Sequence, residues 1–316
     1  MSDKVFKTYK EQIELLTKER GLLIPHPRFF TNCMQKDDYY NIINGYKKYF
    51  IAGMNPERYI QGVTFEQLYA LYTFDQNIRS ELLTELINIE KHIKALISYH
   101  FSEVHGHDHR LYLDPNCFKN DSPQNRRFTS RIISKLEDTI TYYTRMGTNS
   151  ICHYVNEYGY VPLWVLNGVT TMGQVSHFYS CMKLAEQTAV AKHFKISPNQ
   201  MSGFIKFLTD IRNTCAHGSR IYTSNKATMY QKLIPDTRVH TELEIPRNNA
   251  GNYIYGKSDF LAILIMLKYL SAKKDFRIIK KHMKKYYDRM AVQIPDTILA
   301  NIHLEMGLPM NYLYKL

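Results

Sequence analysis

The sequence feature that most constrains the fold is a long stretch without helix-breaking residues. From Thr64 to about Phe101, no proline or glycine interrupts the chain, and Thr64 and Gln67 have the spacing of a helical capping box. Apolar residues recur through this stretch at steps of three and four, as one buried helix face requires; they are Leu68, Leu71, Ile78, Leu82, Leu86, Ile89, Ile93 and Leu96. The stretch therefore predicts one long amphipathic helix.

Asp75 falls on this apolar stripe. A carboxylate at a buried position needs a partner, because burying it alone is costly. Arg79 lies one helical turn further on and can form an ordinary i,i+4 ion pair with it. Alternatively, Asp75 reaches across the helical bundle to orient an arginine or histidine on another helix. The sequence leaves both interpretations open.

A second strong helix signal begins at the letters SPNQ. Ser197 is a candidate N-cap, Pro198 suits the first helical position, and Gln200 completes a capping box. Gly218 is well placed to end this helix in a left-handed conformation. The inward-facing stripe of the helix consists of Phe204, Leu208, Ile211 and Cys215.

The remaining segments predict further helices. Those at 6–20 and 37–51 have the pattern of short helices joined by the loop GLLIPHPRF. We expect Trp164 in a rigid turn, and a loop or small hairpin at 221–256. Helical patterns also occupy 136–146, 174–194 and 258–290.

No alternation of strands and helices suggests a doubly wound sheet, so we predict an all-α protein. We divide it into an N-terminal helical segment at 1–64, a helical core at 65–225, and a loop with a basic helical segment at 226–316, and we expect the three to form one compact unit.

The charge of the chain points to a polyanionic partner. Forty-one Lys and Arg residues against 29 Asp and Glu residues give a net charge of +12, with a pI near 9.3. Nucleic acid is the usual partner of such a protein, although a solvated basic surface is the alternative. Within the run KKDFRIIKKHMKKYYDRM, basic residues recur at steps of three and four. We expect nucleic-acid phosphates to contact Arg277, Lys280, Lys281 and Lys284.

The remaining composition favours a cytoplasmic protein. No segment has the roughly 20 apolar residues of a membrane span, and the N-terminus lacks the apolar run of a signal peptide. The five cysteines include no C-x-x-C pair, which argues against a disulfide framework and a zinc ribbon. The histidine-rich segment HFSEVHGHDHR matches no specific metal spacing, so we expect a solvated loop there, with no metal and no cofactor.

The sequence contains no G-x-x-x-x-G-K-[ST] phosphate-binding loop, no G-x-S-x-G motif of serine hydrolases and no H-E-x-x-H zinc-binding motif. The best candidates for chemistry are three polar residues at the end of the SPNQ helix. Asn213 and His217 are four residues apart and share a helix face. The long side chain of Arg212 can swing to the same edge. An always-charged guanidinium, an amide and a titratable imidazole are thereby expected to converge. The alternative is a structural cap in which the positive charges of Arg212 and His217 interact favourably with the negative end of the helix dipole.

The pattern R-N-x-x-x-H resembles that of the HEPN superfamily, many of whose members are metal-independent ribonucleases. Together with YYNIINGYKKYF, LYTFDQNIRSELLTELINIEKHIK, HYVNEYGYVPLWV and IRNTCAHGSRI, in that order, it resembles the Abi-like (abortive infection, AbiD/AbiF-type) proteins over roughly residues 6–225. The resemblance implies a HEPN-like helical bundle with additional terminal helices, a cytoplasmic bacterial setting and a role in phage defence. Where the family often has a second histidine and a downstream asparagine, this chain has Gly218 and Thr223, while Arg220 is kept.

The resemblance leads us to expect an endoribonuclease in which a ribose 2′-hydroxyl attacks the adjacent phosphodiester. That reaction needs a base and an acid. One chain supplies a single motif histidine, so we expect a homodimer in which two motifs face each other. His217 would be acid or base, Arg212 would stabilise charge and Asn213 would orient the histidine or the phosphate, supported by Asp75, Arg79 and Arg220. The alternative is a non-catalytic RNA-binding or partner-binding toxin module, with a possible RNA or protein antitoxin.

Overall fold

The computed structural model of the chain describes residues 5–147, 149–222 and 233–308. Within these ranges the protein is all-α, which confirms the predicted fold class. The exception is one small antiparallel hairpin, formed by β1 (Ile51–Met54) and β2 (Glu57–Tyr59). This hairpin lies at the end of the segment predicted as a second short helix. That segment instead forms a π-helical turn η2 (Tyr40–Asn44) and a 3-10 turn η3 (Lys47–Tyr49) before β1 begins.

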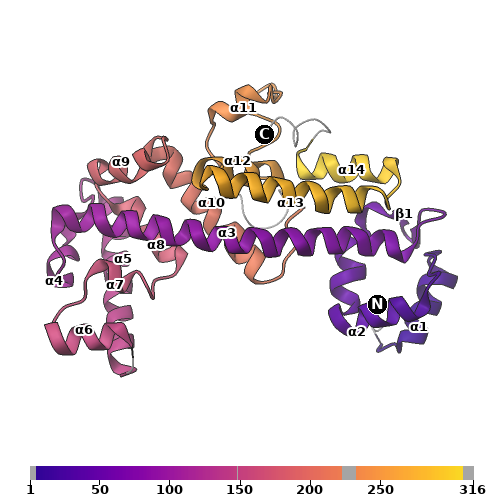
Figure 1. The fold of residues 1–316 in the computed structure, drawn as a ribbon, viewed down its shortest axis with the longest axis horizontal. Coiled ribbons are helices and arrows are strands. Elements are labelled where there is room, and N and C mark those ends of the chain that lie inside the picture. The colour runs from indigo at the N-terminus through magenta and orange to yellow at the C-terminus, as the bar shows by residue number, and fades with distance from the viewer. Residues whose placement is uncertain (1–4, 148, 223–232, 309–316) are drawn as a thin grey trace.

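The predicted long helix is α3 (Phe65–His105), a 41-residue element that is the spine of the molecule (Figure 1). At 1.5 Å per residue it is about 60 Å long. Its capping box at Thr64 and Gln67 is formed, and Gly106 ends it with a φ of 80°. The apolar stripe is buried as predicted, except that Leu96 is only partly buried and Ile97 takes the deeper position.

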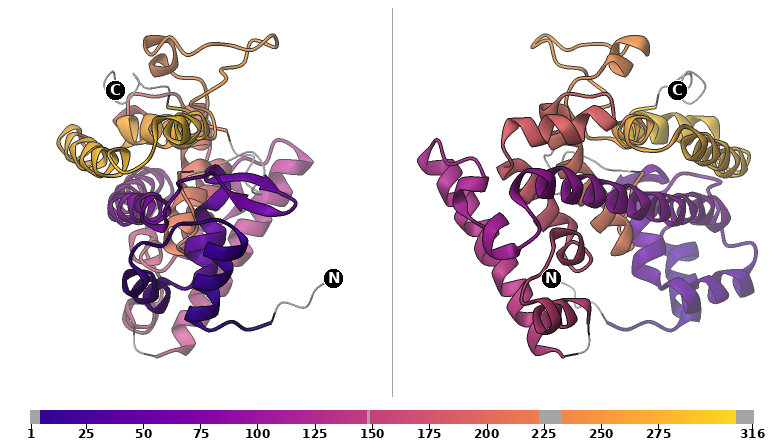
Figure 2. Two further views of the ribbon diagram at one scale, coloured as in Figure 1. Left: turned by 90° about the vertical axis from the view of Figure 1, so that its right-hand side faces the viewer. Right: turned by 60° about the vertical axis from the view of Figure 1, so that its left-hand side comes forward.

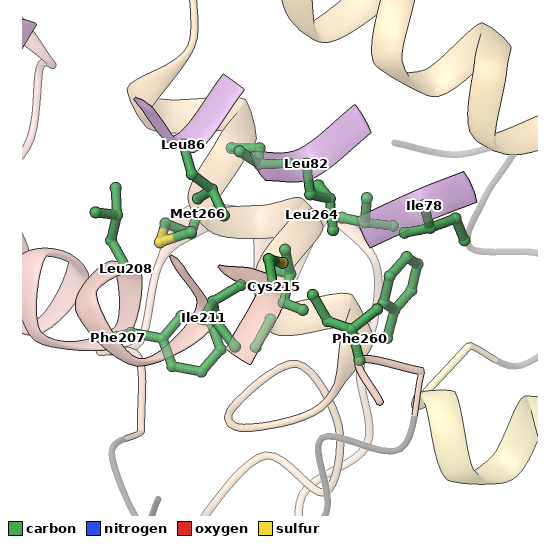
Figure 3. Packing of buried hydrophobic residues seen from close by; sticks show 14 of the residues in the cluster. Ile78, Leu82, Leu86, Phe207, Leu208, Ile211, Cys215, Phe260, Leu264 and Met266 are labelled. Atoms are coloured by element: carbon green, nitrogen blue, oxygen red, sulfur yellow. The ribbon is translucent and has the colours of Figure 1, made fainter. Parts of the chain in front are cut away.

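The SPNQ helix is α10 (Pro198–Ala216), with the expected capping box between Ser197 and Gln200. It packs against the middle of α3 and against α12 (Phe260–Leu270). Figure 3 shows where the three helices meet in the core, with Ile78, Leu82 and Leu86 from α3, Ile211 and Cys215 from α10, and Leu264 and Met266 from α12. This packing fixes the direction of α10 and therefore the place where it ends.

The N-terminal helices are α1 (Tyr9–Glu14), continued by a π-helical segment η1 (Leu15–Glu19), and α2 (Pro27–Asp37). The predicted GLLIPHPRF loop is therefore too long. Pro27 occupies the first turn of α2, where proline is well tolerated because the missing N–H has no intrahelical partner there. These helices lie on one side of α3, opposite α12 and α13 (Figures 1 and 2).

The segment between α3 and α10 forms several helices around the C-terminal end of α3. The helix predicted at 136–146 is part of α5, which begins earlier because Ser122 caps it and a proline occupies its first turn. The helix predicted at 174–194 is broken at Met182, whose ψ of 150° is extended. Trp164 lies in a single helical turn and is 52% exposed. The elements are α4 (His109–Tyr112), η4 (Pro115–Cys117), α5 (Pro123–Arg145), α6 (Ser150–Tyr158), α7 (Leu163–Leu166), α8 (Met172–Cys181) and α9 (Leu184–His193).

The C-terminal part contains α11 (Arg238–Glu242), α12, α13 (Lys273–Ala291) and α14 (Asp296–Met306), of which α11 and α14 were not predicted. The basic helix α13 runs along α3 (Figure 1) and buries Phe276, Ile279 and Met283. One hydrophobic cluster extends from Leu16 to Leu308. None of the described helices is both long enough and apolar enough to cross a bilayer. The boundaries at 64 and 225 stay predictions.

Candidate functional site

The end of α10 presents two of the three predicted motif residues to solvent. His217 directly follows the helix, and its backbone N–H donates to the carbonyl of Asn213 at 2.9 Å. Gly218 then adopts a φ of 68°, which ends the helix in the left-handed conformation that was predicted. Both Asn213 and His217 are exposed.

Asn213 and His217 line a cavity of about 1000 Å³. Its other walls come from α3, through Tyr72 and Arg79, and from the N-terminal segment at 34–46. The end of α10 emerges on the side of α3 that carries α2 (Figures 1 and 2). Three segments distant in sequence therefore meet at the predicted motif.

Asp75 anchors the chain just beyond the motif. Its side chain is fully buried, and Oδ1 accepts the backbone N–H groups of Ile221 and Tyr222 at 3.0 and 2.9 Å. The Tyr46 hydroxyl donates to Oδ2 at 2.6 Å, and Nε of Arg79 lies 3.6 Å from the same oxygen. Burial raises the pKa of Asp75, while Arg79, Tyr46 and the two backbone amides act in the opposite direction.

The two interpretations of Asp75 are thereby resolved. The ion pair with Arg79 is present, and the carboxylate also reaches across the bundle. The carboxylate does not contact an arginine or histidine side chain of α10, as was expected. It accepts hydrogen bonds from backbone N–H groups of the chain that follows α10.

The other two supporting residues hold the same stretch of chain. Arg79 donates a hydrogen bond to the carbonyl of Gly218, and Arg220 donates one to the carbonyl of Gly45 in the N-terminal segment. We call Asp75, Arg79 and Arg220 the clamp. It fixes the chain on the C-terminal side of His217 to both α3 and the N-terminal segment.

Arg212 is separated from the other motif residues. Its Nε lies 3.5 Å from Oε2 of Glu90, a buried residue of α3, and it does not line the cavity. Glu90 also pairs with Lys94 at 2.8 Å, and Lys94 donates to the carbonyl of Thr170 at 2.6 Å. The expected swing of the guanidinium toward Asn213 and His217 is therefore not seen, because a buried carboxylate on the other side attracts it. The role of Arg212 in the site stays a prediction.

Cys215 lies behind the motif in the core. Burial, together with the nearby Asp75 carboxylate, raises the pKa of its thiol to about 12. The thiol is therefore protonated at neutral pH and lacks the thiolate form that acts as a nucleophile. Among the side chains of this helix end, the imidazole of His217 is the group suited to proton transfer.

The predicted RNA-binding residues of α13 lie outside the cavity. Arg277, Lys281 and Lys284 are exposed, and Lys284 pairs with Asp288 at 3.5 Å. Lys280 is partly buried, with its ammonium 5.9 Å from the centre of the Phe276 ring, and burial lowers its pKa. Their contact with RNA stays a prediction.

The prediction of a solvated loop in the histidine-rich segment is wrong, because α3 continues to His105 and α4 begins at His109, and the histidines have separate partners. His105 contacts Glu186 at 2.9 Å, His100 contacts His193 at 2.9 Å, and Nδ1 of His109 accepts the N–H of Val161 at 3.1 Å. Among the residues that the structure describes, no group of three or more His, Cys, Asp or Glu side chains is arranged to hold a metal ion. Thr223, where the chain departs from the family pattern, lies outside the described residues.

Sequence reasoning missed the N-terminal wall of the cavity and the partner of Arg212. The wall contains Asp37, Asp38, Tyr40, Asn41 and Asn44. The available signal was the cluster of polar residues in DDYYNIIN, which predicts a poor helix and suits an exposed turn.

Comparison with known proteins identifies the family. The sequence model of the family described as Abi-like protein matches residues 32–223, which is more than half of the chain. The match includes the N-terminal wall, α3 and all of α10. No curated protein and no solved structure is significantly similar to the chain. The protein belongs to the Abi-like family.

Proposed function

We propose that this protein acts in abortive infection, a form of phage defence, as a metal-independent endoribonuclease of the HEPN type in the cytoplasm. The observation that carries the proposal is the placement of Asn213 and His217 together at an exposed helix end, in a cavity whose neighbouring chain is fixed by the clamp. The net charge of +12 favours a polyanionic substrate.

The proposed reaction is attack of a ribose 2′-hydroxyl on the adjacent phosphodiester. A base takes the proton of the hydroxyl, O2′ forms a bond to phosphorus, the bond from phosphorus to O5′ breaks, and an acid protonates O5′. The products are a 2′,3′-cyclic phosphate and a 5′-hydroxyl end. No metal takes part in this scheme.

The R-N-x-x-x-H motif holds a single imidazole, that of His217, so one chain offers one of the two proton-transfer groups. We propose a homodimer in which two α10 ends face each other, one His217 acting as base and the other as acid. Asn213 orients the phosphate or the imidazole. A guanidinium stabilises the charge that develops on phosphorus in the transition state.

Arg212 can supply that guanidinium only after leaving Glu90. Its side chain is 37% exposed, and neither Nε of Arg212 nor Oε2 of Glu90 has a hydrogen-bond partner in the described structure. A phosphate can accept two parallel hydrogen bonds from one guanidinium, so an RNA phosphate can hold Arg212 more strongly than Glu90 does without a hydrogen bond. We propose that bound RNA draws Arg212 toward His217.

The position of Arg212 also favours a second candidate function. With its guanidinium at Glu90, the helix end can bind RNA or a partner without cutting RNA. In that case the protein is a non-catalytic binding module of a toxin system, and an RNA or protein antitoxin would occupy the cavity.

The test is incubation of the purified protein with mixed cellular RNA in EDTA, with His217→Ala as the control. We expect cleavage by the parent protein, ends that carry 2′,3′-cyclic phosphate and 5′-hydroxyl groups, and no cleavage by the variant. Binding without cleavage would support the second function. Equal cleavage by the parent protein and His217→Ala would exclude His217 from the chemistry.

A further inference from the structure

A second cavity lies between α3 and α13, the two helices that run side by side along the molecule (Figure 1). Its volume is about 450 Å³, and it shares no lining residue with the cavity of Asn213 and His217. We call it the α3–α13 cavity. The chemistry of the proposed ribonuclease makes no use of it.

Glu85 of α3 lines this cavity and is only 7% exposed. Both of its carboxylate oxygens nevertheless remain accessible from the cavity. Within residues 5–147, 149–222 and 233–308, no donor bonds to this carboxylate and no cation pairs with it. A carboxylate that is withdrawn from water without a donor is unfavourable, so a ligand that brings N–H groups to Glu85 gains binding free energy.

The two helices give the cavity two kinds of lining. On the α13 side Ile278, Ile279 and Tyr286 supply apolar surface, whereas α3 supplies hydroxyl and amide groups, among them those of Thr84 and Asn88. Apolar surface for the face of a ring, with hydrogen-bonding groups for its edge, suits a nucleobase. The volume is large enough for one base with its ribose.

The edge of α13 beside this cavity carries a row of lysines, which are Lys274, Lys281 and Lys285. Ile278, which lines the cavity, falls into the same row at steps of three and four residues, so the lysines share its helix face. All three are exposed, and none has a hydrogen bond or ion pair in the described part of the chain. We call them the lysine row. It provides positive charge for phosphates next to the cavity.

Two further carboxylates line the cavity. Oε1 of Glu81 contacts Nδ1 of His282 at 2.7 Å, so this glutamate already has a partner. Asp275 is exposed in the first turn of α13, beside Lys274 in the sequence. Among the described residues, Glu85 is therefore the carboxylate of this cavity that is both buried and without a partner.

A ligand of this cavity has to suit both Glu85 and the lysine row. A cationic group would pair with Glu85, but the lysine row would repel it. A nucleotide suits both, since its base is neutral and its phosphates are anionic. A carboxylate accepts best from two adjacent N–H groups. Guanine offers N1–H and N2–H side by side on one edge, while adenine, cytosine and uracil offer no such adjacent pair.

We propose that the α3–α13 cavity binds a guanine nucleotide, with the two oxygens of Glu85 accepting N1–H and N2–H, Ile278 and Tyr286 contacting the base, and the lysine row contacting the phosphates. The nucleotide is either free or one residue of an RNA strand. Because the cavity shares no lining residue with that of His217, the inference stands apart from the proposed endoribonuclease.

The base contact is tested by isothermal titration calorimetry of the full-length protein with GDP, ADP, CDP and UDP. We expect GDP to bind at least about tenfold more tightly than the others, as two hydrogen bonds to a charged group imply. Inosine diphosphate lacks the N2 amino group, so it should bind about fivefold or more weakly than GDP. An inosine diphosphate affinity equal to that of GDP would overturn the paired contact with Glu85.

Glu85→Gln tests the same contact from the side of the protein. The amide of the variant offers one acceptor and one donor, which match N1–H and the C2 carbonyl of xanthine. Xanthosine diphosphate should therefore bind the variant more tightly than it binds the parent protein, while GDP does the reverse. Glu137→Gln, an equal charge change on the exposed face of α5, should alter neither affinity. A variant that melts like the parent protein and shows no such exchange of preference would exclude Glu85 as the acceptor.

The lysine row is tested by Lys274→Gln combined with Lys285→Gln. This variant should bind GDP more weakly and should bind guanosine, which has no phosphate, as the parent protein does. Arg127→Gln combined with Arg131→Gln removes the same charge from the exposed face of α5 and is the control. An equal loss for GDP and guanosine, or an equal effect of both variants, would exclude the phosphate contact.

The source of the nucleotide is tested with labelled UUGUU and UUUUU by fluorescence anisotropy, in His217→Ala protein so that no RNA is cut. Tighter binding of GDP than of UUGUU identifies a free nucleotide, and the reverse identifies RNA. No guanine preference in either form would overturn the site. If guanine is preferred but the parent protein cuts no RNA, the site stands and the endoribonuclease falls. If RNA is cut and no guanine preference exists, the endoribonuclease stands and the site falls.

Discussion

Arg212 and Glu90 form an ion pair in which the guanidinium Nε lies 3.5 Å from the carboxylate Oε2. This pair places the arginine of the R-N-x-x-x-H motif on the α3 side of α10, away from the cavity that Asn213 and His217 line. In the proposed enzyme, Glu90 therefore competes with the RNA phosphate for Arg212.

Glu90→Gln should release Arg212, because the amide keeps the shape of the side chain and loses its charge. We expect the KM for RNA to fall by about two- to tenfold, and the melting temperature to fall slightly because Lys94 also loses its partner. Steady-state cleavage of a labelled RNA measures the first effect. Glu186→Gln, at an equally buried glutamate of α9 whose partner is His105, is the matched control. An unchanged KM in Glu90→Gln would show that Glu90 does not restrain Arg212.

Asp75→Ala should destabilise the protein strongly. It leaves two backbone N–H groups and the Tyr46 hydroxyl without their acceptor, and it leaves Arg79 without its carboxylate. Breaking a buried pair in this way costs about 3–5 kcal/mol in free energy of unfolding. Urea denaturation measures the loss, with Asp138→Ala on the exposed face of α5 as control. A variant as stable as the parent protein would contradict the role of Asp75 in holding the chain after α10.

The local signals predicted α3 and α10 well, because capping boxes, uninterrupted apolar stripes and Gly218 act within a few residues. The hairpin at 51–59 escaped prediction because its two strands are short and mostly exposed, so no alternating apolar pattern marks them. The short helix α14 packs against η3, which is distant in the sequence. At the site, spacing correctly joined Asn213 to His217. It could not show which way the flexible Arg212 side chain turns, because Glu90 on another helix decides that.

The buried His240 should make stability depend on pH. Its Nδ1 accepts the N–H of Thr237 at 3.1 Å, and its Nε2 contacts the Gly256 carbonyl at 2.8 Å, so the neutral ring suits both neighbours. Burial lowers its pKa in the folded protein. The unfolded chain, with an ordinary pKa of about 6.5, therefore binds a proton first as the pH falls.

The stabilising contribution of His240 is full above about pH 6.5 and declines as the pH falls below that value. The melting temperature should thus fall as the pH is lowered from 7.5 to 5.5. In His240→Gln the melting temperature should depend less steeply on pH. His303, also buried with a lowered pKa, should act in the same direction. A slope equal in the parent protein and His240→Gln would exclude His240 as its source.

The basic residues of α13 should contribute to RNA affinity by neutralising phosphates. Replacing Arg277, Lys280, Lys281 and Lys284 with Gln should weaken binding and reduce the slope of log K against log salt by about 0.7 for each phosphate that is no longer neutralised. Cleavage at saturating RNA should be unchanged, because Asn213 and His217 are untouched.

The matched control removes four positive charges from the exposed face of α5, at Arg126, Arg127, Arg131 and Lys135. The salt slope is measured by anisotropy for both variants. An unchanged slope in the α13 variant, or an equal change in both, would show that α13 does not bind RNA specifically.

Oligomeric state bears directly on the chemistry, since each 37.3-kDa chain brings one motif histidine. Light scattering of the active protein should give at least twice that mass. A strictly monomeric protein that still cuts RNA would contradict a composite site.

The most direct measurement uses heterodimers in which only one subunit carries His217→Ala, isolated by a different affinity tag on each subunit. If one His217 is the base and the other the acid, the composite site of the heterodimer lacks one of them. Cleavage in EDTA should then fall by about 10²–10⁴-fold relative to the parent homodimer. A heterodimer that keeps half of the parent activity would mean that each subunit cuts RNA alone, and would contradict the composite site.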